Sequence, residues 1–133
     1  MADHAARKDE LRQAALARRD ALSPQWRAEA SIEAARNGAG AIALEAGAVV
    51  AGFLPIRSEI DPTPLMQRLA QGGARLCLPC IVDAETIVFR AWRPGDPLQD
   101  MKLATRGATG SAMAAASTIA RSRVWRLVVQ LHA

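Results

Sequence analysis

The sequence of 133 residues contains no tyrosine, and only 4% of its residues are aromatic. Proteins that bind single-stranded nucleic acids stack the bases on aromatic side chains, so a platform of that kind is not expected here. The formal net charge is +4, but the arginines are spread through the chain instead of gathering in one segment. We therefore expect solvated basic faces with a few anion contacts, and no nucleic-acid partner.

Long apolar runs are also missing. No run approaches the roughly 20 residues that span a bilayer, so no membrane contact is expected. The N-terminal charges are not followed by the apolar segment of a secretory signal, and the KDEL string at 8–11 is internal, whereas a retention signal is C-terminal. Half of the residues are hydrophobic and 23% are charged, as in a globular domain. We expect a cytoplasmic location and a monomer.

Cysteine is scarce as well, since the chain has Cys77 and Cys80 alone, in a C-x-x-C motif. A redox pair would need the motif at a helix N-terminus, where the dipole lowers a thiol pKa. A zinc site would need a second pair, which the chain lacks, so no metal ligands are predicted. The interpretation we favour is two small hydrophobic side chains at the end of a buried strand, because Leu78 and Pro79 suit a strand end better than a helix start.

What the chain does have at its start is a run of good helix formers from Ala5 to about Asn37, with apolar residues near helical spacing. Ser23 and Pro24 divide this run, because serine is a good N-cap and proline suits the first position of a helix. The pattern therefore predicts an N-terminal helical hairpin whose second helix ends near Asn37 and Gly38.

Three apolar segments then predict strands, over 46–56, 74–79 and 86–92. Between the first two, residues 62–71 predict a helix that stops at Gly72-Gly73, and residues 94–97 predict a turn. Strand, helix and strand at this spacing indicate a three-layer α/β fold with a βαβ parallel-type sheet. Ligands of such sheets bind beyond the carboxyl ends of the strands, which points to residues 53–59.

The composition changes after Gln99. Residues 101–122 are mostly Ala, Thr, Ser, Gly and Arg without an amphipathic stripe, and the apolar stretch 124–132 has no identifiable partner. A stable domain is consistent at every level of its sequence. We therefore divide the chain into an α/β domain over 1–99, which looks truncated, and a divergent tail over 100–133.

Several motifs in order resemble the 5-formyltetrahydrofolate cyclo-ligase (methenyltetrahydrofolate synthetase) family, over about residues 8–98. The family carries K-x-x-L-R on its first helix, matched by Lys8, Leu11 and Arg12. Its first strand ends in a turn that begins E-[IV], here Glu59-Ile60, and its next strand reads G-x-x-[LV]-x-[LV]-P, here residues 73–79. A strand with an aromatic residue before G-[DE]-x-L follows, matched over 92–98.

The resemblance implies ATP-dependent cyclisation of 5-formyltetrahydrofolate to 5,10-methenyltetrahydrofolate, with ATP and Mg²⁺ as cofactors and ADP and phosphate released. It places Lys8 and Arg12 at the ATP phosphates; four residues apart, they share one helix face. It also implies that Glu59 accepts hydrogen bonds from the pterin, with Leu54 as a secondary folate contact. By themselves these residues also fit a solvated basic face and a loop acid near a helix N-terminus. No catalytic residue is assigned.

The family's glycine-rich loop, G-Y-G-x-G-[FY]-Y-D-R, which wraps the nucleotide phosphates, is missing from the chain. Back-translated with GC-rich codons and read from the third base of each codon, residues 107–126 give GYRLGYGGGIYDRAIARLA. We interpret the tail as an out-of-frame translation of the loop region and expect this copy to be impaired, because the loop contacts supply the rate of phosphoryl transfer. The alternative is a non-catalytic metabolite-sensing α/β domain.

Overall fold

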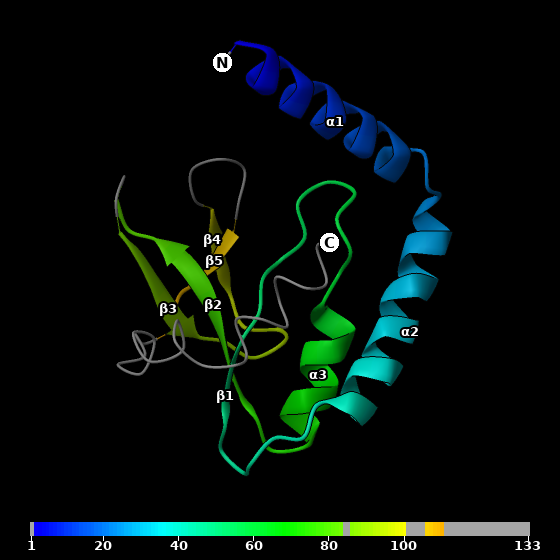
Figure 1. The fold of residues 1–133 in the computed structure, drawn as a ribbon. Helices are drawn as coiled ribbons and strands as arrows, with labels where there is room; N and C mark the ends of the chain where they lie inside the picture. Colours follow the sequence, from blue (N-terminus) through cyan, green and yellow to red (C-terminus); the bar gives the residue numbers. More distant parts are fainter. Residues whose placement is uncertain (1, 84–85, 101–105, 111–133) are drawn as a thin grey trace.

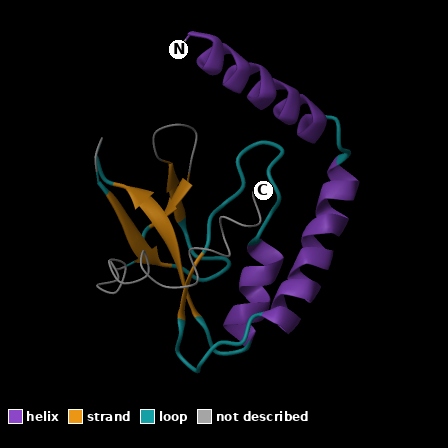
Figure 2. Ribbon diagram, viewed as in Figure 1, coloured by secondary structure: helices purple, strands orange, loops and turns teal. Residues whose placement is uncertain are grey.

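The computed structural model describes residues 2–83, 86–100 and 106–110. Within these residues the chain forms three helices and two small sheets, an α/β arrangement (Figures 1 and 2). The elements in chain order are α1 (Ala2–Asp20), α2 (Pro24–Ala41), β1 (Val49–Ala51), α3 (Thr63–Gln71), β2 (Arg75–Ile81), β3 (Ile87–Ala91), β4 (Leu98–Asp100) and β5 (Arg106–Ala108). None of the described helices combines the length and the apolar character needed to cross a bilayer.

The break between the first two helices lies where the sequence predicts it. Ser23 caps α2, since its Oγ accepts a hydrogen bond from the backbone N–H of Trp26 at 3.1 Å, and Pro24 is the first helical residue. The helices do not pack as the expected hairpin, however. Residues 3–15 of α1 are exposed, and the two helices point in different directions on either side of the break (Figure 1).

The second helix also runs past its predicted end at Asn37-Gly38, to Ala41. Gly38 lies inside it because α3 approaches there: a Cβ on Gly38 would come within 2.9 Å of Leu65 Cδ1. The glycine thus permits close helix packing instead of ending the helix. As a result α3 lies between α2 and the sheet (Figure 1).

The βαβ unit is confirmed. β1 pairs in parallel with β2, with Val50 opposite Leu76, and α3 forms the crossover between them. The helix ends at Gln71 with Gly72 as its C-cap, and Gly73 has φ +101, as expected for a glycine stop. β1 is much shorter than the predicted 46–56 strand, because only residues 49–51 find partners on β2.

The sheet is mixed, which differs from the parallel sheet we expected. β3 pairs antiparallel with β2, with Pro79 opposite Phe89. The turn after β3 was predicted correctly: Asp96 Oδ2 accepts a hydrogen bond from Arg93 N–H at 2.8 Å, and Gly95 has φ +97.

The core lies between the sheet and α3. Its buried members are Val50, Met66, Leu69, Leu76, Leu78, Trp92 and Ala108. Ala108 belongs to the segment assigned to the tail, and it reaches the core because β5 pairs antiparallel with β4. The first described residues of the tail, 106–110, therefore pack against the α/β domain, while the out-of-frame interpretation concerns 107–126, of which all but 107–110 lie outside the described residues.

Candidate functional site

The loop after β1 forms a tight turn over residues 56–59. The backbone N–H of Glu59 donates to the carbonyl oxygen of Ile56 at 3.2 Å, and the N–H of Ile56 donates to Glu59 Oε2 at 3.0 Å. The turn requires φ +54 at Arg57, a left-handed conformation that costs a non-glycine residue about 1 kcal/mol. These contacts fix the Glu59 carboxylate at the carboxyl end of β1.

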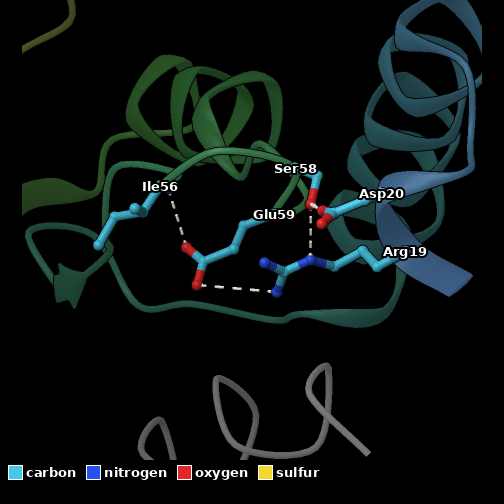
Figure 3. A network of polar contacts seen from close by, with 5 residues as sticks. All are labelled: Arg19, Asp20, Ile56, Ser58 and Glu59. Carbon is cyan, nitrogen blue, oxygen red and sulfur yellow. Dashed lines mark hydrogen bonds and ion pairs between the residues drawn. The ribbon is translucent and has the colours of Figure 1, made fainter. Parts of the chain in front are cut away.

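The last turn of α1 is joined to this loop by a polar network (Figure 3). Ser58 is 6% exposed, and its hydroxyl accepts a hydrogen bond from Arg19 Nε at 2.9 Å while donating to Asp20 Oδ1. Arg19 Nη1 also lies 4.0 Å from Glu59 Oε1. One serine thus ties two residues of α1 to the turn that carries Glu59. We call Arg19, Asp20, Ser58 and Glu59 the Ser58 network.

Glu59 keeps capacity for a ligand despite these contacts. Its side chain is 25% exposed, so one quarter of it is open to solvent. Each carboxylate oxygen can accept two hydrogen bonds. Within the described residues, Oε2 takes the N–H of Ile56, and Oε1 takes only the long contact with Arg19. The carboxylate can therefore accept N–H groups from a bound molecule.

Lys8 and Arg12 are not brought to this turn. Both are exposed on α1. At 1.5 Å per residue, they precede Arg19 by about 16 Å and about 10 Å along the helix axis. The structure therefore keeps the two cations together on one helix face, pointing to solvent, and brings Arg19 instead to Glu59.

Leu54, the other predicted folate contact, is partly buried and packs against the core. Its side chain belongs to the apolar interior next to the loop. Of the four residues singled out in the sequence, Glu59 is the one that the structure places in the polar network.

The cysteine motif lies on β2, as favoured above. Cys77 is 0% and Cys80 2% exposed, and both thiols are free. Residues three apart on a strand face opposite sides and lie about 10 Å apart, which is too far for a disulfide. Burial raises the pKa of the Cys77 thiol to about 11, so this thiol is a poor nucleophile.

Within the described ranges, no group of three His, Cys, Asp or Glu side chains is placed so that it could hold a metal ion.

A pocket of about 350 Å³ opens between the first half of α2 and the loop that carries Glu59. We call it the α2–loop pocket; its lining residues are Pro24, Arg27, Ala28, Ser31, Ile32, Pro55, Arg57, Glu59, Asp61 and Pro64. It lies beyond the carboxyl end of β1, where ligands of α/β sheets bind. A larger hollow, of about 870 Å³, lies around the opposite end of β2, next to Arg75.

Sequence reasoning missed Arg19, Asp20 and Ser58 as members of a site. The contact between Arg19 and Ser58 joins residues 39 apart in the chain, and no spacing rule connects them. Their local signal was weak: Arg19 and Asp20 precede a helix break, and Ser58 lies in a polar turn.

Comparison of the chain with protein-family models, with curated proteins and with solved structures finds no match. The assignment of a function therefore depends on the motifs of the sequence and on the geometry of the site.

Proposed function

We propose that residues 1–99 are the front part of a 5-formyltetrahydrofolate cyclo-ligase domain of three-layer α/β type, and that this copy turns over poorly because it lacks the glycine-rich ATP loop. The proposal rests on the ordered motifs from Lys8 to Leu98. The single structural observation that supports it is the Ser58 network, which connects the end of α1 to the Glu59 turn.

In this proposal the Glu59 carboxylate accepts hydrogen bonds from the pterin ring. The turn over 56–59 holds the carboxylate before the ligand arrives, because Ile56 N–H donates to Oε2 at 3.0 Å while Arg19 lies 4.0 Å from Oε1. The network thus orients an acceptor at the carboxyl end of β1.

Lys8 and Arg12 would meet the phosphates of ATP in this proposal. Both are exposed and share one face of α1, so both are available to one anion. When bound, ATP supplies the phosphoryl group that turns the formyl oxygen into a leaving group, and Mg²⁺ is held mainly by the phosphates. The chain's own contribution is to hold the folate at Glu59 and to supply these two cations.

Binding without turnover is the expected behaviour. Addition of 5-formyltetrahydrofolate should raise the melting temperature of the purified protein, because a ligand that binds the folded state stabilises it. Glu59→Gln should reduce this shift, whereas Glu33→Gln, which changes an exposed acid of α2, should leave it unchanged. A lack of any shift, or an equal loss in both variants, would refute the folate site.

The impairment has its own test. ATP-dependent formation of the methenyl product should be very slow, and the coding sequence should restore the G-Y-G-G-G loop after a single-base shift near codon 100. A protein made from the corrected frame should gain turnover, and Lys8→Met with Arg12→Met should remove it. Rapid turnover by the chain as it stands would contradict the proposal.

A further inference from the structure

The α2–loop pocket has an apolar wall that the proposed folate contact does not explain. Pro24, Ile32, Pro55 and Pro64 supply this wall, and Ile32 is 50% exposed. A large aliphatic side chain exposed beside three proline rings offers a surface for an apolar ligand body.

Two arginines face the same pocket, Arg27 from α2 and Arg57 from the turn. Arg27 is partly buried, and its Nε is shielded from solvent without a hydrogen-bond partner among the residues that the structure describes. Arg57 is exposed, and no hydrogen bond or ion pair to its guanidinium is formed within that part of the chain. The Nη groups of Arg27 likewise form no hydrogen bond or ion pair within these residues, so they and the Arg57 guanidinium are available to bind an anion in the planar manner of arginine.

The two acids of the pocket contact groups other than Arg27 and Arg57. Glu59 takes the N–H of Ile56 and the contact with Arg19. Asp61 Oδ1 accepts a hydrogen bond from the N–H of Thr63 at 2.9 Å, at the start of α3. The acids therefore do not neutralise the arginines through direct contacts. They do balance the formal charge of the pocket, which makes a monoanion a better ligand than a dianion such as phosphate.

The backbone at Arg57 gives a second, independent reason. A residue at φ +54 is expected to be glycine, asparagine or aspartate, because these adopt the left-handed region at low cost. The hydrogen bonds of the turn hold this conformation, but the arginine side chain itself makes no hydrogen bond or ion pair inside the described structure that would explain its choice over glycine. Strain of this kind is typical of residues kept for binding.

We infer that the α2–loop pocket binds a small carboxylate ligand with an aromatic or apolar body. The carboxylate lies against Arg27 and Arg57, and the body packs on the proline and Ile32 wall. This site goes beyond the proposed cyclo-ligase reaction, which assigns no role to either arginine. Glu59 borders both sites, so the two ligands should compete.

Benzoate is the probe that tests this site, with binding followed by chemical shifts or calorimetry on the full chain. Inorganic phosphate tests the preference for a monoanion, and benzyl alcohol tests the need for the carboxylate. Benzoate should bind at least tenfold more tightly than benzyl alcohol, because a charge-assisted hydrogen bond is worth that factor or more. It should also bind more tightly than phosphate, which has no apolar body to pack on the proline and Ile32 wall.

The variants separate binding from folding. Arg27→Met and Arg57→Met should each weaken benzoate binding about tenfold, whereas Arg36→Met, an exposed arginine of α2 outside the pocket, should not. Arg57→Gly should lose the same affinity while its melting temperature stays equal or rises, because glycine relieves the left-handed strain. A structural role for Arg57 would lower the melting temperature instead and would overturn the inference.

Two other results would also overturn it: equal binding of benzyl alcohol and benzoate, or equal weakening in Arg36→Met. Both outcomes leave the folate proposal intact, because these probes contain no pterin and the variants keep Glu59. Conversely, loss of folate binding with benzoate binding preserved would refute the proposed function alone.

Discussion

α1 and α3 are both regular helices, but different forces hold them. α1 has 19 residues, most of them exposed, and Leu11 on it is 61% exposed. α3 has only 9 residues, yet Met66 and Leu69 are buried at 2% and 8% exposure. A helix of nine residues is unstable alone in water, so α3 depends on the sheet, whereas α1 relies on its own helix-forming residues.

This difference in burial distinguishes the stable core of the protein from the parts of the chain that are available to ligands. α3 and its neighbours form the interior, while polar side chains in the last turn of α1 join it to the loop after β1. The cations Lys8 and Arg12 lie on the exposed helix, and Glu59 lies at its anchored end. Mutations in the two helices should therefore act on different properties.

The largest expected effect is on the free energy of unfolding and comes from a change in α3, the buried helix. Met66→Ala should lower the free energy of unfolding by about 2–5 kcal/mol, since it removes a buried side chain and leaves a cavity. Leu11→Ala, the matching truncation on α1, should change it by less than about 0.5 kcal/mol. Urea unfolding of both variants measures the contrast. Equal destabilisation would mean that α1 is packed in solution.

A smaller effect comes from the thiol of Cys77. Its pKa is raised from 9.0 to about 11 by burial, so below pH 9 both folded and unfolded chains keep the proton. As the pH rises from 9 towards 11, the unfolded chain loses its proton first, and stability falls by about 1.4 kcal/mol per pH unit. The test compares unfolding free energies of the original chain and Cys77→Ala at several pH values. Parallel curves would contradict the burial of this thiol.

Much of this architecture could be predicted because its signals are local. The Ser23-Pro24 break, the Gly72-Gly73 stop and the turn at Gly95 each depend on the conformational preferences of one or two residues. The βαβ unit follows from the order of such segments. The structure confirms each of these predictions.

What could not be predicted depends on contacts between distant residues. β1 is reduced to Val49–Ala51 because its length is set by pairing with β2, and the antiparallel direction of β3 is likewise a property of the pair. Gly38 could be read as a helix end or as a close approach, and only the position of Leu65 decides between them.

The residues of the candidate site divide in the same way, into those with a local sequence signal and those placed by contacts between distant segments. Glu59 was found through the resemblance of its turn, and its place at the carboxyl end of β1 follows from the βαβ rule. Arg19 and Ser58 join segments 39 residues apart, so their contact has no local signal. Arg27 was missed because an arginine on an exposed helix face is usually solvated; its shielded Nε becomes visible only in three dimensions.

The smallest expected effect concerns the anchor between the two regions. Ser58→Ala removes both hydrogen bonds to α1 and should lower the free energy of unfolding by about 1 kcal/mol, because Arg19 and Asp20 can turn to water. Trypsin should then cut more quickly after Arg18 and Arg19, while the core resists as before. Thr86→Ala changes an exposed residue far along the chain and serves as the control, which should leave this cleavage unchanged. Unchanged cleavage after Arg18 and Arg19 would mean that Ser58 does not hold α1, and that the Glu59 turn and the helix bearing Lys8 and Arg12 are independent parts.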